Sequence, residues 1–254
     1  MAIYDAHIHL TDNEFSEYIH HMIAGMRAMN IVACSVTVNI ETTLKSLKLF
    51  SAHRDVVKQF VGIHPESAAR EDLESFKGIF RKNLDSIDGV GEIGLDGTYA
   101  EKGVATYEQQ RKTFGAMLEL AESSNKPVSI HSRRALDDIL QTLPSYKIKG
   151  LLHWFAGSKK QLAKSMDMGL YVSYGPVLVY SEEKQVLLKN TLKDRFLVET
   201  DGPVRYSRCF EGIPAMSNSF LVSVVSSVAS VLNLTYDETC ALLERNTLAY
   251  LSAS

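Results

Sequence analysis

A regular alternation of short apolar segments and longer amphipathic segments constrains the fold of this chain more than any other feature. Eight short runs, mostly of apolar residues, look like buried strands: residues 3–10, 31–38, 56–63, 89–96, 127–131, 150–153, 170–174 and 196–201. Strands that alternate with helices imply right-handed crossovers and a parallel sheet. Eight such units in 254 residues predict an α/β protein with a (β/α)8 TIM barrel; an open doubly wound sheet is the alternative.

The segments between these runs place apolar residues at the three- and four-residue spacing of helices. The predicted helices are residues 14–30, 41–53, 67–84, 106–124, 135–143, 158–168, 182–192, 217–232 and 236–251. The last of these is an extra C-terminal helix beyond the eight units. Because no linker or change in composition marks a boundary, we expect one barrel domain over residues 1–254.

Charge and cysteine content argue against several classes of protein. The net charge is −3, whereas proteins that bind nucleic acid by overall electrostatics are strongly basic. Any contact with nucleic acid must therefore come from local basic patches. Cys34, Cys209 and Cys240 are far apart, which suits reduced thiols in a cytosol better than a disulfide framework or a thiolate zinc site. With no signal-peptide pattern and no apolar run of about 18 residues, we expect a cytoplasmic protein that does not span a membrane. Nothing in the sequence implies a stable protein partner.

Histidines and carboxylates collect at the carboxyl ends of the predicted strands. His7 and His9 are two residues apart on the first strand, so both rings can reach one metal ion. Later strand ends carry Glu92, His131, His153 and Asp201. These ends converge on one mouth of a barrel, and buried histidines and carboxylates are costly unless they are paired or coordinated. The six residues therefore predict a site for two divalent ions, with Glu92 as a bridging ligand.

For three other polar residues near these strand ends, two interpretations are open. His64, beside Pro65, is a metal ligand or substrate contact, or else a hydrogen-bonded turn residue. Asp5 either orients a histidine ring or anchors its strand, and Asp96 either supports the site or caps the following loop. Glu199 is expected to support the site from behind, because alternation directs it to the same side as Asp201.

Six motifs, in order along nearly the whole chain, resemble those of the TatD-type metal-dependent deoxyribonucleases of the amidohydrolase superfamily. They are Asp-Ala-His-Ile-His-Leu at 5–10, Gly-Ile-His-Pro at 62–65, Gly-Glu-Ile-Gly-Leu-Asp at 91–96, Lys-Pro-Val-Ser-Ile-His-Ser-Arg at 126–133, His-Trp-Phe-Ala-Gly at 153–157 and Glu-Thr-Asp-Gly-Pro at 199–203. The resemblance implies hydrolysis of DNA phosphodiester bonds, often from a 3′ end. It also implies that His7, His9, Glu92 and Asp201 hold one ion, that Glu92, His131 and His153 hold the second, and that His64 lies at the substrate phosphate.

The expected chemistry assigns roles to the residues around the mouth. Two ions would lower the pKa of a water molecule and stabilise charge on phosphate, and their ligands suit zinc, manganese, cobalt or, less well, magnesium. Asp201 is the expected general base, with Glu92 as the second catalytic carboxylate. Arg133 and Arg205 are candidate phosphate contacts, and Tyr206 is a candidate surface for stacking on a base of single-stranded DNA. Further basic candidates are Arg134, Arg208, Lys159 and Lys160.

Departures from the family pattern concern the substrate and leave the ligands intact. Glu66 stands where the family usually has another histidine, Gly97-Thr98-Tyr99 replaces the usual aromatic residues, and the Arg-Asn-x-Pro run after Asp201 is missing. Two alternatives therefore stay open. One is an amidohydrolase-type esterase, amidase, lactonase or aminoacyl-tRNA deacylase with the same metal centre, and the other is a non-catalytic metal-binding or nucleic-acid-binding protein.

Overall fold

The computed structural model describes residues 1–208 and 212–252, so Cys209, one of the three expected thiols, lies outside the described residues. Eight parallel strands follow one another around a single sheet in sequence order. They are β1 (Ile3–Ile8), β2 (Ile31–Val36), β3 (Val57–Val61), β4 (Gly89–Gly94), β5 (Val128–His131), β6 (Gly150–Leu152), β7 (Tyr171–Tyr174) and β8 (Phe196–Val198). Backbone hydrogen bonds from Asp201 to His7 (2.9 Å) and from His9 to Gly202 (2.8 Å) bring the chain after β8 back to β1. The predicted (β/α)8 barrel is confirmed.

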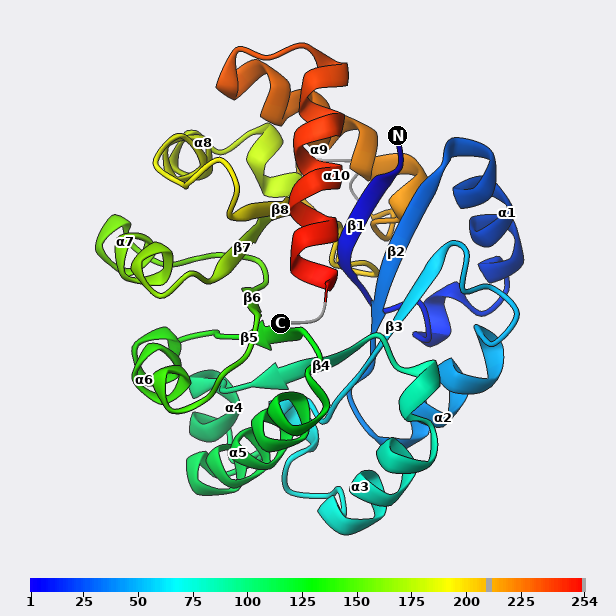
Figure 1. Cartoon of the computed structure of the whole chain (residues 1–254), viewed down its shortest axis with the longest axis vertical. Coiled ribbons are helices and arrows are strands. Elements are labelled where there is room, and N and C mark those ends of the chain that lie inside the picture. The colour runs from blue at the N-terminus through cyan, green and yellow to red at the C-terminus, as the bar shows by residue number, and fades with distance from the viewer. Residues whose placement is uncertain (209–211, 253–254) are drawn as a thin grey trace.

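Helices surround the strands (Figure 1). They are α1 (Ile19–Met29), α2 (Ile40–Leu49), α3 (Leu73–Lys82), α4 (Gly97–Glu101), α5 (Tyr107–Ser124), α6 (Leu136–Thr142), α7 (Lys159–Asp167), α8 (Glu182–Lys189), α9 (Ser217–Leu232) and α10 (Tyr236–Leu251). Short 3-10 turns are η1 (Asn13–Phe15), η2 (Pro65–Ser67), η3 (Leu84–Ser86), η4 (Leu143–Ser145) and η5 (Pro176–Val179). The short helix α4 was not predicted, because five residues are too few to show an apolar period.

The first helix differs from its prediction at one end. The backbone forms a 3-10 turn at 13–15, where the Asp12 side chain accepts a hydrogen bond from the Glu14 amide, and α1 begins only at Ile19. Asn30 ends the helix in the left-handed conformation with φ 54°, as the sequence predicted. The apolar period therefore predicts a helix that is too long at its start, because Asp12 caps a separate 3-10 turn there.

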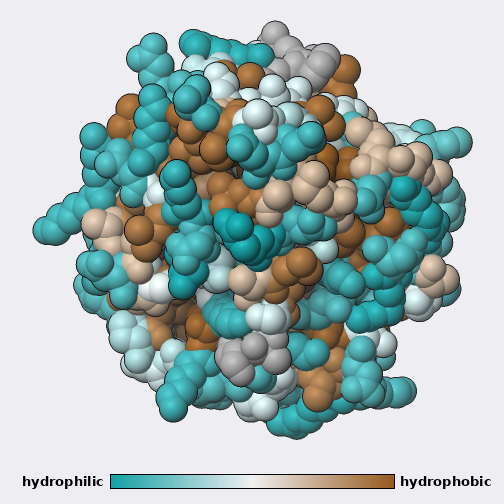
Figure 2. Space-filling model, turned by 45° about the horizontal axis from the view of Figure 1, so that its top comes forward, coloured by the Kyte–Doolittle hydropathy of each residue, from teal (hydrophilic) through white to brown (hydrophobic). Residues whose placement is uncertain are grey.

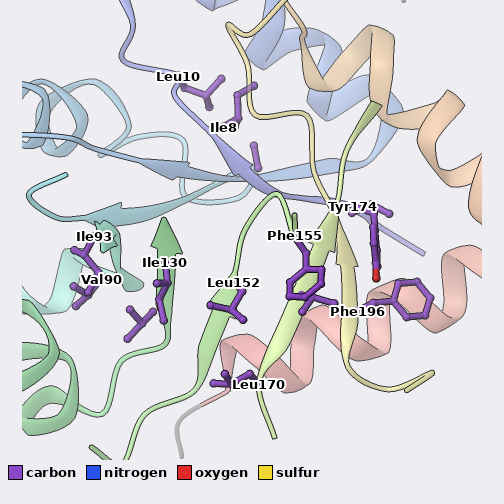
Figure 3. Close-up of a cluster of buried hydrophobic side chains, with 14 of the residues drawn as sticks. Ile8, Leu10, Val90, Ile93, Ile130, Leu152, Phe155, Leu170, Tyr174 and Phe196 are labelled. Atoms are coloured by element: carbon purple, nitrogen blue, oxygen red, sulfur yellow. The ribbon is translucent and has the colours of Figure 1, made fainter. Parts of the chain in front are cut away.

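The outward faces of the strands form the main core against the helices. Ile130 of β5 and Leu152 of β6 are register partners, and Figure 3 shows them among the labelled apolar side chains of neighbouring strands. Figure 2 shows apolar residues interspersed with polar ones over the displayed face of the molecule. Scattered exposed apolar residues are ordinary for a folded chain, so the apolar surface that organises this fold is the buried one.

Aromatic side chains fill the interior of the barrel away from the mouth. The interior cluster consists of Ala6, Cys34, Val36, Phe60, Leu151, Tyr171, Leu197 and Tyr250. Tyr250 comes from α10, which crosses the strands in the centre of Figure 1, and its ring lies 5.4 Å from that of Tyr171 and 6.1 Å from that of Phe60. The extra C-terminal helix thus contributes a fully buried ring to the barrel interior.

Tyr250→Ala should lower the free energy of unfolding by about 3–5 kcal/mol, because it leaves a cavity among packed aromatic rings. Tyr250→Phe should change it by less than about 1 kcal/mol, since the Tyr250 hydroxyl is buried and has no hydrogen-bond partner among the described residues. Urea unfolding followed by circular dichroism measures both. Equal losses for the two variants would contradict this account of the ring as the stabilising part.

In the described part of the chain, no single helix is long and apolar enough to cross a membrane. By length and composition alone α9 and α10 would suffice as a pair, but a bend of 105° separates them.

Candidate metal centre

A cavity of about 1080 Å³ opens at the carboxyl ends of the strands. Its lining includes six of the titratable residues singled out from the sequence: His9, His64, Glu92, His131, His153 and Asp201. His7 is completely buried and lies beneath this surface, with its ring stacked on that of His153 at 3.8 Å. All six predicted ligands are therefore gathered at one place.

Glu92, in the second half of β4, lies in the middle of this group. Its Oε1 is 2.9 Å from His131 Nδ1 and 2.8 Å from His153 Nε2. Its Oε2 is 3.5 Å from His7 Nε2 and 3.3 Å from His9 Nε2. Oε1 also lies 3.5 Å from His64 Nε2, so the two carboxylate oxygens face separate groups of imidazole nitrogens, which is the arrangement a bridging carboxylate needs.

Asp201 completes the group formed by His7 and His9. Its Oδ1 lies 3.5 Å from His7 Nε2 and 3.4 Å from His9 Nε2, so that the same two nitrogens face carboxylates of β4 and of the segment after β8. The left-handed backbone of Asp201, with φ 50°, is held by the hydrogen bond from its amide to the His7 carbonyl. Non-glycine residues in this conformation cluster at functional sites, where the surrounding structure offsets their cost.

The donor atoms fit divalent ions. Among the described residues, three groups have donor atoms all within 4.8 Å of one another: His7, His9 and Asp201; His7, His153 and Glu199; and His64, Glu92 and His131. His7 Nε2 and His153 Nδ1 are buried without a hydrogen-bond partner in the described part of the chain. Buried polar atoms normally have partners, and imidazole with carboxylate is a common donor set for zinc, manganese and cobalt. An ion among these atoms would give His7 Nε2 the partner it lacks.

Hydrogen bonds behind the rings select which nitrogen faces the centre. Ser129 Oγ lies 2.8 Å from His7 Nδ1, and Asp96 Oδ2 lies 2.7 Å from His131 Nε2. A ring that donates its other N–H in this way presents a lone pair to a metal and keeps its orientation. Ser129 was missed from the sequence, although alternation along β5 places it on the same side as His131.

Ser129→Ala should weaken metal binding by about 10- to 100-fold, because the His7 ring loses the partner that fixes its orientation. Titration of the metal-free protein with Zn²⁺ in a calorimeter measures this affinity. Ser123→Ala, which removes a hydroxyl from α5 instead, is the matched control and should leave the affinity unchanged. Equal affinities for wild type and Ser129→Ala would show that this hydrogen bond does not orient the ring.

Asp96 has both of the functions considered for it. Its Oδ1 accepts hydrogen bonds from the Thr98 and Tyr99 amides at the start of α4, and its Oδ2 faces His131 and, at 2.7 Å, Arg133 Nε. Burial alone would raise the pKa of this carboxyl, but His131 and Arg133 hold it well below its usual range. Asp96 therefore stays ionised while it orients His131.

The metal-free centre combines ionised carboxylates with both neutral and protonated imidazole rings. Burial would raise the pKa of Glu92, but the surrounding imidazoles hold it well below its usual value. Burial lowers the pKa of His7 to about 4 and that of His64 to about 3. Burial also disfavours charge on His9, but Asp201 and Glu92 outweigh it and raise its pKa to about 9. A metal ion would displace the proton from such a ring, since both compete for one lone pair.

Asp5 anchors its strand, and in the described part of the chain its carboxylate makes no hydrogen bond to an imidazole ring. Its carboxylate accepts hydrogen bonds from the Thr200 amide (2.9 Å) and hydroxyl (2.6 Å) and from the Ser217 hydroxyl (2.7 Å). Glu199 accepts from the Trp154 amide (2.7 Å) and the Ser173 hydroxyl, and its Oε1 is 4.0 Å from His153 Nδ1. Glu199 therefore lies behind the site, where alternation placed it.

His64 occupies the turn between β3 and η2 and also reaches the centre. Its Nδ1 accepts a hydrogen bond from the Glu66 amide, and its Nε2 is 3.5 Å from Glu92 Oε1. Arg133 and Arg134 line the cavity, with Arg134 paired to Glu101 at 2.7 Å.

The structure does not bring Arg205 and Tyr206 to the cavity. Arg205 pairs with Glu14 at 2.8 Å and is not among the cavity-lining residues. Tyr206 is 3% exposed and donates its hydroxyl to the Thr200 carbonyl, so the expected stacking on a base does not fit its position. Arg208, Lys159 and Lys160 are likewise absent from the lining of this cavity in the described part of the chain. Trp154, which sequence reasoning missed, does line it and stacks on Tyr206.

Comparison with known proteins identifies the family. The sequence model of the family described as TatD related DNase matches residues 4–252. The chain belongs to the TatD family. It is 24% identical over 252 residues to an uncharacterized metal-dependent hydrolase, YabD, of Bacillus subtilis, with 96% of each chain covered. It is 26% identical over 240 residues to a 3′-5′ ssDNA/RNA exonuclease, TatD, of Pantoea ananatis, with 90% of this chain and 91% of that protein covered.

A solved structure supports the fold. The crystal structure of the TatD homologue YjjV from Escherichia coli K12 superposes with a TM-score of 0.88 and 22% identity, covering 98% of this chain and 97% of the other. Together with the family match, these comparisons make the chain a metal-dependent hydrolase of the TatD family.

Proposed function

We propose that this TatD-family hydrolase is a deoxyribonuclease that removes nucleotides from the 3′ ends of single-stranded DNA with two divalent ions. The observation that carries the proposal is the position of Glu92 between two groups of possible metal ligands. Its Oε1 faces His131 and His153, and its Oε2 faces His7 and His9. A relative of similar length is named as a 3′-5′ ssDNA/RNA exonuclease, which supports nucleic acid as the substrate. In the proposed site His7, His9, Glu92 and Asp201 hold one ion, and Glu92, His131 and His153 hold the other.

The side chains around the centre suit this reaction. Bound ions would lower the pKa of water and stabilise negative charge on the phosphate oxygens. Asp201, whose Oδ1 faces the His7 and His9 nitrogens, accepts the proton of the attacking water. Although burial opposes ionisation, His9, His153 and His7 hold the pKa of Asp201 below its usual value, so that it is ready to act as a base at neutral pH.

Arg133 is the proposed phosphate contact at the cavity wall. Its Nε is held by Asp96 at 2.7 Å and its guanidinium lies 4.9 Å from the centre of the Tyr99 ring, which fixes its position. The Arg133 side chain lines the cavity and is 49% exposed, so its guanidinium is accessible to a ligand there. A positioned guanidinium suits phosphate oxygens. His64, with Nε2 beside Glu92, is proposed to lie at the substrate phosphate itself.

Hydrolysis of a 5′-labelled single-stranded DNA oligonucleotide, with Mn²⁺ or Zn²⁺ and with EDTA, tests the proposal. Stepwise shortening that needs the metal and is lost in His131→Ala is the expected result. Hydrolysis of carboxylic esters or lactones without any shortening of DNA or RNA would overturn it and establish the alternative esterase reaction.

A further inference from the structure

We propose that Glu66 and Tyr99 form a specificity-determining site that accepts an amino group of the substrate's base. This inference rests on the proposed function, since it places a nucleotide in the cavity. It concerns recognition and not the metal chemistry.

Glu66 lies in the cavity wall, one imidazole ring away from the proposed reaction centre. Its Oε2 is 3.9 Å from His64 Nδ1, and the opposite nitrogen of that ring is 3.5 Å from Glu92 Oε1. The Glu66 side chain is 35% exposed. A group that contacts Glu66 is therefore within the span of one nucleotide from a phosphate held beside Glu92.

The Glu66 carboxylate keeps acceptor capacity that Asp138, another acidic side chain of the cavity, has used. Oδ1 of Asp138 pairs with Arg111 at 3.1 Å, and its Oδ2 accepts from the Tyr107 hydroxyl. Among the described residues, no lysine or arginine lies within 4.0 Å of the Glu66 carboxylate. Its Oε2 accepts from the Tyr99 hydroxyl at 3.0 Å. Its Oε1 is thus available to a donor from outside the chain.

Tyr99 positions this carboxylate. Its ring is contacted edge-on by His64 at 5.8 Å, and the Arg133 guanidinium lies over it at 4.9 Å. Burial and the negative charge of Glu66 raise the pKa of the Tyr99 hydroxyl to about 12, so it remains a hydrogen-bond donor. With one oxygen fixed by Tyr99, the other is presented to the cavity in a defined orientation.

The charge of Glu66 determines what it can receive. An ionised carboxylate only accepts hydrogen bonds and repels a phosphate, so this wall suits a base better than the DNA backbone. Carboxylates accept from the N4 amino group of cytosine. Uracil has a carbonyl oxygen at that position, which a carboxylate repels. Cytosine and uracil therefore form a matched pair that differs at the recognised group.

The test uses two single-stranded DNA oligonucleotides that differ only in a 3′-terminal dC or dU. We expect wild-type protein to hydrolyse the dC end with a kcat/KM about tenfold higher, within the discrimination typical of one specific base contact. Glu66→Gln should reduce this ratio to within about twofold, because an amide can accept from cytosine or donate to uracil. Tyr99→Phe, which keeps the ring but removes the hydroxyl, should reduce the ratio in part.

Glu74→Gln is the matched control, because it removes the same charge from the exposed side of α3, where Glu74 pairs with Lys77. It should keep the tenfold ratio. Hydrolysis of both ends at equal rates by the wild type, or an unchanged ratio in Glu66→Gln, would overturn the inference while leaving the nuclease function intact.

Binding of dCMP and dUMP to the metal-loaded protein, measured by calorimetry, separates this inference from the proposed function. Preferential binding of dCMP that is lost in Glu66→Gln, without hydrolysis of either oligonucleotide, would support the recognition site and overturn the nuclease reaction. Equal affinities for dCMP and dUMP, or binding of neither, together with no hydrolysis would overturn both.

Discussion

Glu92→Gln should lower the rate of hydrolysis by about 10³-fold or more, because the two oxygens of Glu92 contact both groups of imidazole nitrogens. The amide keeps the shape of Glu92 but loses its charge and one acceptor oxygen. In the metal-free protein the same change should also lower the free energy of unfolding by about 3–5 kcal/mol, the usual cost of breaking a buried charged network. Steady-state kinetics and urea unfolding measure the two effects.

Glu244→Gln is a control for the loss of one negative charge far from the cavity, since Glu244 accepts a hydrogen bond from the Ala2 amide at 2.8 Å. It should leave the rate unchanged. A Glu92→Gln variant that binds two ions and hydrolyses substrate within tenfold of the wild type would show that a bridging carboxylate is not required.

Asp201→Asn should lower kcat by about 10²- to 10⁴-fold, the usual contribution of a positioned general base. The asparagine side chain fits the same space and can still offer its oxygen toward His7 and His9, but it cannot take a proton from water. Single-turnover kinetics at saturating metal measure the chemical step, and elemental analysis measures the metal content of the variant.

The relation between these two quantities decides the role of Asp201. A large loss of rate with little loss of metal is the expected result for a general base. A proportional loss of both, restored by adding metal, would instead mean that Asp201 acts only as a ligand, with an indirect effect on the rate. Hydrolysis like that of the wild type would contradict either role.

The barrel and the clustering of six titratable residues could be predicted from sequence because both depend on local patterns. Strand residues were recognisable from short apolar runs, and parallel strands bring their carboxyl ends to one mouth wherever the helices lie. Glu92 and His131 are 39 residues apart, yet their contact follows from their positions near the carboxyl ends of the neighbouring strands β4 and β5. The expected assignment of these residues to two ions stays a prediction.

The contacts that depend on side-chain directions could not be predicted. Tyr206 follows Arg205 directly, but its ring is buried while Arg205 reaches Glu14 near the start of the chain. Likewise, the Asp5 carboxylate binds the side chains of Thr200 and Ser217, which are about 200 residues away, and not the imidazole rings beside it. No apolar period or sequence motif indicates such side-chain contacts, because they depend on how loops and the first turns of helices pack against the closed barrel.

The number of metal ions bound tests the central claim most directly. Metal-free protein titrated with Zn²⁺, with bound metal measured after removal of the excess, should hold two ions per chain. His131→Ala should hold one, because it leaves the His7, His9, Glu92 and Asp201 group intact. A single ion in the wild-type protein, or two ions still bound tightly in His131→Ala, would contradict the division of ligands by the two oxygens of Glu92.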